Sequence, residues 1–193
     1  MSIGKKKNSE TFDVTRPIVL IGMMGAGKSS LGKRLAAVLG LAFRDADDKI
    51  EEAANMSIAE IFKTHGEAAF RDGEQRVIAR LLQDGPQILA LGGGAFLNPT
   101  TRELIQQTAT SVWLDAELDE LVDRVQRKPG KRPLLVGTDI RAKLQQLMNE
   151  RGPVYAEAHM RVNITRTDHK ASVKAIRKAL HEHFTQPSEE GQS

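Results

Sequence analysis

The stretch from Gly22 to Ser29 has the residue types that phosphate binding needs. It reads Gly-Met-Met-Gly-Ala-Gly-Lys-Ser and matches the pattern G-x-x-x-x-G-K-[ST]. Its glycines let backbone N–H groups turn inward around a phosphate chain. Lys28 adds a charge that reaches the terminal phosphates, and the Ser29 hydroxyl suits a Mg²⁺ ligand. The motif therefore predicts a nucleoside triphosphate site, which we expect to be formed by Gly25, Ala26, Gly27, Lys28, Ser29 and Ser30.

Two carboxylates, Asp45 and Asp47, follow a short apolar run at 41–43 that could be a strand. Two carboxylates that are separated by one residue at a strand end can have different functions. One can hold Mg²⁺ through water, while the other hydrogen-bonds a hydroxyl group and takes its proton. The alternative is that Asp47 or Asp48 merely caps the next helix. The phosphate loop upstream favours the functional interpretation.

Gly92-Gly93-Gly94 comes directly after an expected buried strand, so its N–H groups could contact a ligand, although a flexible turn is the alternative. Three arginines are placed unusually, and the planar fork of arginine suits carboxylates and phosphates. Arg71 lies early in a long helix, Arg132 lies in a basic, proline-broken stretch, and Arg151 precedes Gly152-Pro153 at an expected helix end. Spacing alone does not separate these three from Arg76, Arg80 or Arg127.

Helices and strands must position these residues, and the chain alternates the two patterns. Strands are expected at 17–21, 41–43, 87–91, 111–114 and 160–164. Helices are expected at 29–39, 58–64, 67–82, 100–107, 117–127, 139–151 and 171–184. Ser57 and Glu60 form a capping box for the second of these helices, and His65-Gly66 should end it. The alternation predicts an α/β fold of three layers, a parallel sheet of about five strands with helices on both faces. Its functional loops should lie at the carboxyl ends of the strands.

Composition narrows the class of protein. A chain of 193 residues favours one domain, which we place at 16–186, after a mobile extension at 1–15 and before a disordered tail at 187–193. No apolar run is long enough to span a bilayer, no secretory signal is visible, and there are no cysteines. We therefore expect a cytoplasmic protein without membrane contact, and we expect a monomer. A net charge of +3 with one lysine triplet gives no case for nucleic acid. His65, His159 and His169 share no metal-ligand spacing, so we expect surface or cap positions.

Taken in order, these motifs resemble the shikimate kinase family, whose members phosphorylate the 3-hydroxyl of shikimate in aromatic amino-acid biosynthesis. The resemblance covers roughly residues 18–180. Besides the phosphate loop and the aspartate pair, it rests on Ser57-Ile58-Ala59-Glu60-Ile61-Phe62, Gly66-Glu67, Phe70-Arg71, Leu91-Gly92-Gly93-Gly94-Ala95, Arg132-Pro133-Leu134-Leu135 and Arg151-Gly152-Pro153-Val154-Tyr155.

The resemblance implies ATP and Mg²⁺ as cofactors, shikimate as the small-molecule substrate, and roles that spacing does not assign. Asp47 would be the candidate base at the shikimate hydroxyls, and Asp45 would hold Mg²⁺ through water together with Ser29. Arg71, Gly93 and Arg151 would bind the substrate, the two arginines at its carboxylate. It further implies a helical substrate-binding insertion at about 46–82 and a lid at about 128–139, whose Arg132 closes over the phosphates. Arg124 or Arg127 would stack on adenine, and we favour Arg124. Ala46 departs from the family, which often has Thr or Ser between the aspartates.

Two other functions fit a phosphate loop. A GTPase switch would need the strings N-K-x-D and D-x-x-G, and the chain has neither. Another small-molecule kinase, such as a gluconate kinase, would present similar arginines to a carboxylate. The Arg-Pro-Leu-Leu stretch and the Gly-Gly-Gly-Ala run favour shikimate.

Replacing the motif lysine tests the phosphate loop. Lys28→Met should abolish turnover, because the transferring phosphate loses its nearest fixed positive charge. The measurement is ADP release in a coupled assay. Release at the wild-type rate would contradict the assignment of the loop.

Overall fold

The structure is a computed structural model that describes residues 12–127, 139–165 and 168–185. It contains a single five-stranded sheet in which every pair of neighbouring strands is parallel. The strands are β1 (Ile18–Ile21), β2 (Ala42–Asp45), β3 (Gln87–Ala90), β4 (Thr110–Asp115) and β5 (Met160–Asn163). Their order, β2-β3-β1-β4-β5, confirms the predicted α/β class and the number of strands.

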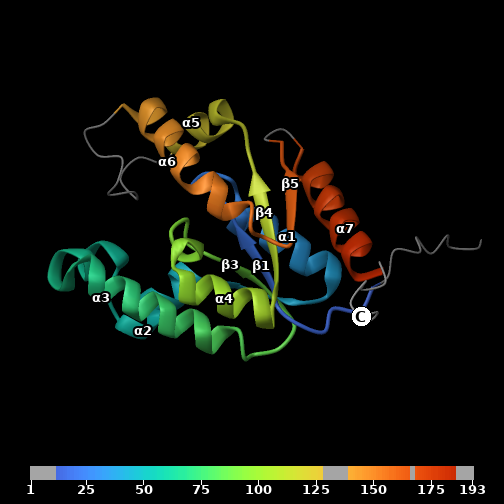
Figure 1. The fold of residues 1–193 in the computed structure, drawn as a ribbon, viewed down its shortest axis with the longest axis horizontal. Coiled ribbons are helices and arrows are strands. Elements are labelled where there is room, and N and C mark those ends of the chain that lie inside the picture. The colour runs from blue at the N-terminus through green and yellow to red at the C-terminus, as the bar shows by residue number, and fades with distance from the viewer. Residues whose placement is uncertain (1–11, 128–138, 166–167, 186–193) are drawn as a thin grey trace, which may run out of the picture.

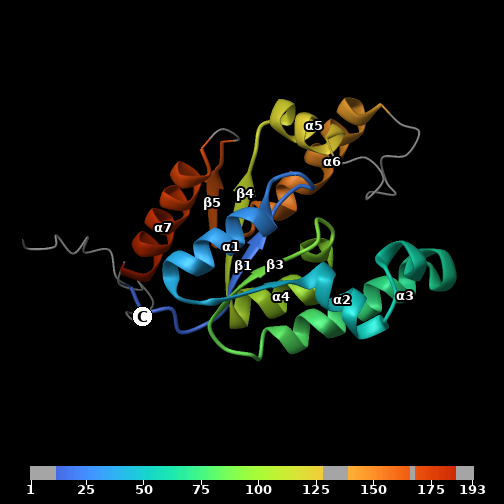
Figure 2. The same cartoon turned by 180° about the vertical axis from the view of Figure 1, so that it is seen from behind.

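Helices cover both faces of this sheet (Figures 1 and 2). One face carries α1 (Lys28–Leu39) and α7 (His169–Thr185), and the other carries α4 (Pro99–Thr108), which packs on β4. The remaining elements are α2 (Ala46–Ala54), α3 (Ile58–Leu81), the 3₁₀ turn η1 (Ala95–Leu97), α5 (Leu118–Gln126) and α6 (Ile140–Tyr155). The three-layer prediction is therefore correct.

The core lies between these layers. Every residue of β1 and of β3 is buried, as expected for parallel strands covered on both faces. The edge strand β2 is more exposed and ends at Asp45. Because β1, β2 and β3 are parallel neighbours, their carboxyl ends bring the phosphate loop, the aspartate pair and the glycine triplet to one edge of the sheet.

The two helices α2 and α3 pack on each other beside the sheet and have a small hydrophobic cluster of their own, made of Ile50, Ile61 and Phe70. The predicted capping box of Ser57 and Glu60 begins α3. Helix α3 breaks at Gly66, whose φ of 79° and ψ of 174° are not helical. The sequence therefore predicted this break correctly. The exact bounds of the proposed insertion at 46–82 stay a prediction.

Two local predictions are wrong. The helix after β2 is capped by Asp45, whose carboxylate accepts from the N–H of Asp47, and not by Asp47 or Asp48. Asp47 is thereby left for other contacts. Helix α6 does not end at Arg151, because it continues through Pro153 to Tyr155. A proline inside a helix removes a hydrogen bond and costs about 3 kcal/mol, so tertiary contacts of the last turn must offset it.

The termini are only partly described. We expected an extension up to residue 15, and its described part begins at Phe12. The ring of Phe12 stacks on Phe184 with centroids 5.5 Å apart, so the packed structure begins earlier than residue 16. The predicted tail at 187–193 and most of the lid at 128–139 lie outside the described residues. Within the part of the chain that the structure describes, no helix is long and apolar enough to cross a membrane.

His159 is a half-buried side chain at the end of the sheet away from the phosphate loop. Its Nδ1 accepts from the backbone N–H of Ser111 at 3.1 Å and lies 2.8 Å from the Ser111 hydroxyl. It is therefore part of the packed structure and not the surface or cap residue that we expected. Burial lowers its pKa below the ordinary 6.5, and the charges of Arg16 and His183 lower the pKa further.

This lowered pKa predicts acid sensitivity. The unfolded chain takes up the proton more readily than the folded chain, so this contribution to the free energy of unfolding is full above pH 6.5 and is lost as the pH falls below it. His159→Asn keeps an acceptor near the position of Nδ1 but does not titrate, so its unfolding free energy should fall less between pH 7 and pH 5. Urea unfolding of both proteins at each pH gives the difference. Parallel curves would contradict the prediction.

Candidate active site

The phosphate loop joins β1 to α1 and owes its shape to three glycines with positive φ. Gly22, Gly25 and Gly27 have φ of 139°, 85° and 91°, values that other residues rarely adopt. A Cβ at Gly22 would also lie 2.5 Å from the carbonyl oxygen of Leu114 on β4. The glycines of the motif are thus required by backbone geometry as well as by the approach of an anion. The loop leads into the N-terminus of α1, where the helix dipole favours negative charge.

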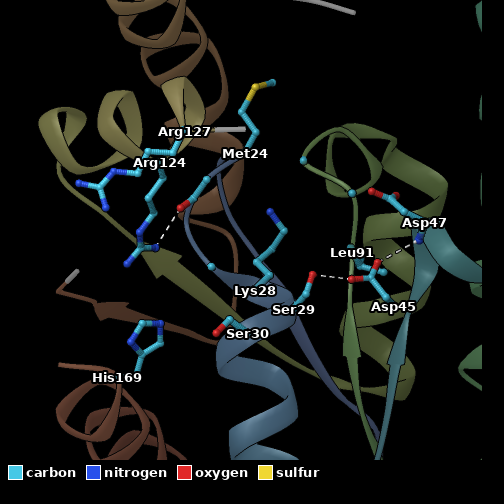
Figure 3. Close-up of a pocket in the computed structure, with 14 residues that line it drawn as sticks. Met24, Lys28, Ser29, Ser30, Asp45, Asp47, Leu91, Arg124, Arg127 and His169 are labelled. Atoms are coloured by element: carbon cyan, nitrogen blue, oxygen red, sulfur yellow. Dashed lines mark hydrogen bonds between the residues drawn. The ribbon is translucent and has the colours of Figure 1, made fainter. Parts of the chain in front are cut away.

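Lys28 and Ser29 begin α1 and line a cavity of about 420 Å³ (Figure 3). The Lys28 ammonium donates to the carbonyl oxygens of Gly22 and Met23 at 2.8 and 3.0 Å. The Ser29 hydroxyl donates to Asp45 Oδ2 at 2.5 Å, which joins the loop to the end of β2. A hydroxyl and a carboxylate that face one cavity are ligands that Mg²⁺ accepts, with waters and phosphate oxygens completing its shell. Their pairing fits the predicted metal position.

The described residues contain no group of three His, Cys, Asp or Glu side chains that could hold a metal ion by themselves. Of the other predicted nucleotide residues, Gly25, Gly27 and Ser30 line the cavity. Ala26 is fully buried, and its N–H donates to the Met23 carbonyl oxygen at 3.1 Å, so it shapes the loop from inside.

Asp47 lies in the first turn of α2 and lines the same cavity. Burial, and next to it the negative charge of Asp45, raises its pKa from 3.8 to about 6, although the positive charge of Lys28 acts in the opposite direction. A carboxylate with this pKa is ionised at neutral pH and still basic enough to take a proton. Catalytic carboxylates are commonly raised in this way by burial and like charge.

The glycine triplet after β3 lets charged side chains approach its backbone. A Cβ at Gly92 would lie 2.7 Å from Asp47 Oδ1, and one at Gly94 would lie 2.8 Å from Arg71 Nη1. At Gly93 the carbonyl oxygen accepts from Arg151 Nη1 at 3.0 Å. The triplet is thus the common neighbour of three predicted site residues, which come from α2, α3 and α6. The flexible-turn alternative does not explain these contacts.

Glu74 is a member of this group that the sequence did not single out. It is only 3% exposed, and its carboxylate accepts from Arg71 Nη1 at 2.7 Å. Burial raises the pKa of Glu74, while the hydrogen bond and charge of Arg71 lower it. The available signal was its position three residues after Arg71, on one helix face. The pair joins a buried carboxylate to an arginine that is one-third exposed.

Arg124 and Arg127, the two candidates for the adenine contact, both line the cavity. Arg124 Nη1 donates to the Gly25 carbonyl oxygen at 2.9 Å and therefore lies directly over the phosphate loop. Arg127 is 67% exposed and lies 3.9 Å from Asp123. His169, the first residue of α7, lines the cavity as well, a position that its spacing did not predict. Arg132 lies outside the described residues.

The fold is a parallel α/β sheet with a phosphate loop at the carboxyl ends of its strands. Beside the loop lie Ser29 and Asp45, which can bind a metal ion, and the basic carboxylate of Asp47. Together these features define a small-molecule kinase of the P-loop class. The family model for shikimate kinase matches residues 24–181. A shikimate kinase from Caulobacter vibrioides is 55% identical over 165 residues, which are 86% of this chain and 82% of the relative. One from Rhodopseudomonas palustris is 51% identical over 169 residues, covering 88% and 83%. The chain belongs to the shikimate kinase family.

Solved structures support the same family membership. The shikimate kinase from Acinetobacter baumannii in complex with shikimate aligns with a TM-score of 0.84 at 31% identity, covering 89% of this chain and 96% of that one. The chain is thus an ATP- and Mg²⁺-dependent transferase that phosphorylates shikimate, as predicted from the motifs. The family membership also decides against the GTPase and gluconate kinase alternatives.

Substituting single glycines of the triplet should distinguish the kinetic effect of its contact with Asp47 from that of its contact with Arg71. Gly92→Ala forces the buried Asp47 carboxylate aside, and a displacement of this size costs about 10²-fold in rate, so kcat should fall. Gly94→Ala instead displaces Arg71, for which the family resemblance implies a contact with the shikimate carboxylate, and losing such a charge-assisted contact should raise the KM for shikimate by roughly 10- to 100-fold. Steady-state kinetics with varied shikimate measures both.

The matched control is Gly73→Ala, since a Cβ at Gly73 in α3 meets nothing within 4 Å. It should leave both constants unchanged. A Gly92→Ala enzyme with wild-type kcat would show that the backbone approach of Asp47 is unimportant.

Proposed function

We propose that this site transfers the γ-phosphoryl group of ATP to the 3-hydroxyl of shikimate, with Asp47 as the group that accepts the hydroxyl proton. The observation that carries this assignment is the Asp47 carboxylate, lying at the cavity with a pKa of about 6. A bond forms between the substrate oxygen and the γ-phosphorus. The bond from that phosphorus to the bridging oxygen breaks, and its electron pair leaves with ADP.

The nucleotide side of the site follows from the loop. We assign the phosphates to the backbone N–H groups of the loop and to Lys28, and Mg²⁺ to Ser29 and Asp45, whose oxygens are 2.5 Å apart. Mg²⁺ supplies neutralisation of phosphate charge in this position. We assign adenine to Arg124, supported by its contact with Gly25 next to the loop. Arg132, which lies outside the described residues, is proposed to neutralise the phosphates from the lid.

The substrate side is the glycine triplet with its arginines. We propose that Arg71 and Arg151 bind the shikimate carboxylate and that Gly93 contacts the same molecule. In support, both arginines lie against the triplet, Arg151 through its hydrogen bond to Gly93 and Arg71 beside Gly94. Glu74 holds the Arg71 guanidinium through an ion pair at 2.7 Å. Two fixed guanidinium groups suit a carboxylate better than a phosphate that moves during the reaction.

We further propose that the chain works as a monomer in the cytoplasm, without nucleic acid or membrane as a partner. The chain has no cysteines and a modest net charge of +3, and both fit this proposal. Sedimentation of the purified protein over a range of concentrations would detect an oligomer.

Asp47→Asn tests the assignment of the base. The amide keeps the size of the side chain but accepts no proton, so kcat should fall by about 10²–10⁴-fold. In the wild-type enzyme, activity should decline as the pH falls through about 6, because Asp47 becomes protonated, and the variant should lack this decline. The variant should be at least as stable as the wild type, since a buried charge that disfavours folding is removed. The measurements are pH profiles of kcat and thermal melts.

Asp45→Asn is the matched control because the two carboxylates are neighbours with different proposed roles. Its loss of activity should be partly restored by high Mg²⁺, whereas that of Asp47→Asn should not. Rescue of the Asp47 variant alone would mean that the two roles are exchanged. A kcat within about tenfold of wild type for both variants would refute the base assignment.

A further inference from the structure

Tyr155, the last residue of α6, makes a contact that the proposed chemistry does not use. Its ring is 1% exposed, and its hydroxyl donates to the carbonyl oxygen of Gly93. The same oxygen accepts from Arg151 Nη1 at 3.0 Å. A carbonyl oxygen has two lone pairs, so these two donors satisfy it completely. One peptide group of the glycine triplet is therefore held from α6 at two points.

Holding this carbonyl group restricts a backbone that would otherwise be free. Glycine loses more conformational freedom on ordering than any other residue, and three occur here in succession. In a planar trans peptide, C=O and N–H point in opposite directions, so fixing the Gly93 carbonyl toward α6 points the Gly94 N–H away from it. Among the described residues, no protein acceptor is recorded for the Gly93 or Gly94 N–H. The Gly94 N–H thus keeps a fixed direction, and the Gly93 N–H is oriented separately by the bond from the Ala95 N–H to the Gly92 carbonyl oxygen at 3.2 Å.

Tyr155 also acts on Arg151, which lies one helical turn before it. Residues four apart share a helix face, and this relation exists only because α6 continues through Pro153. The two side chains are adjacent because both donate to the Gly93 carbonyl oxygen. Burial raises the pKa of Tyr155, and the charge and hydrogen bonding of Arg151 lower it less. The hydroxyl therefore stays protonated at neutral pH and remains a donor.

The Tyr155 ring has support that is independent of its hydroxyl. It packs against Trp113 on β4 with centroids 6.0 Å apart, and Trp113 is covered by the Arg161 guanidinium at 4.4 Å. Removing the hydroxyl alone should leave this packing in place. The core role of the ring and the polar role of the hydroxyl can thus be separated by substitution.

We propose that the Tyr155 hydroxyl is a positioning group that holds Gly93 and Arg151 in the arrangement that binds the shikimate carboxylate. This inference rests on the substrate roles proposed above for those two residues. Tyr155 itself touches no reacting atom. It lowers the cost of ordering the triplet and one guanidinium before the substrate arrives, which is preorganisation.

Tyr155→Phe tests the proposal. Losing one neutral hydrogen bond to an ordered backbone should raise the KM for shikimate by roughly 3- to 10-fold, and the shikimate dissociation constant measured by calorimetry should rise equally. The kcat and the KM for ATP should change by less than about twofold, because the phosphate loop is untouched. The variant should fold, since the Gly93 oxygen keeps its bond from Arg151. An unchanged shikimate affinity would overturn the proposal.

Trp113→Phe is the control for packing, because it loosens the ring but leaves the hydroxyl. It should lower the melting temperature more than Tyr155→Phe does and shift the shikimate KM less. The reverse pattern would mean that Tyr155 is only a core residue.

Arg151→Ala separates the two levels of inference. If it leaves shikimate affinity unchanged, the proposed substrate site is wrong. If it weakens affinity while Tyr155→Phe does not, only the positioning role fails. The double variant should lose less than the product of the two single losses, because residues that act through one another are not additive. Independent losses would contradict the coupling.

Discussion

The close approach of charged side chains to a backbone without Cβ atoms is the constraint on which the site depends. Asp47, Arg151 and Arg71 come from three different helices, and each lies against one residue of the glycine triplet. An alanine at Gly92 or Gly94 would place a carbon within 3 Å of a charged atom. The phosphate loop shows the same kind of close approach at Gly22, whose backbone lies against the carbonyl oxygen of Leu114. The two glycine turns, after β1 and after β3, are adjacent, since a Cβ at Gly93 would lie 3.6 Å from the carbonyl oxygen of Gly22, and both turns line the cavity.

Concentrating charge in this way opposes stability. Asp47 is ionised at neutral pH although its pKa is about 6 in the folded chain and 3.8 in the reference state. A difference of this size corresponds to roughly 3 kcal/mol that disfavours folding above pH 6. Glu74, buried at 3% exposure, adds a second carboxylate, whose charge the Arg71 ion pair compensates. The site is therefore a locally unfavourable arrangement that the rest of the core must support.

That support comes from two packed regions. The main core lies around the sheet, with β1 and β3 fully buried. The smaller cluster of Ile50, Ile61 and Phe70 joins α2 to α3, which carry Asp47 and Arg71. Residues of both helices also belong to the main core, among them Ala46 and Ile78, so the two clusters together hold α2 and α3 beside the sheet. Helix α6 carries the remaining site residue, Arg151. Its last turn is held by Tyr155, which contacts both Gly93 and the Trp113 ring.

Local patterns in the sequence determined the strand–loop–helix order around Lys28, the capping box at Ser57, the break at Gly66 and the parallel α/β class, because these depend on neighbouring residues and on glycine geometry. The resemblance to known kinases supplied roles that spacing did not. The tertiary structure alone decided that Asp45 caps α2 and leaves Asp47 at the cavity, that Glu74 is buried against Arg71, and that α6 runs through Pro153. The positions of Asp47 and Glu74 depend on burial, which local patterns do not report. A proline predicts a helix end locally, whereas contacts of the last turn with distant residues, such as that of Tyr155 with Gly93, 62 residues earlier, help to offset its cost.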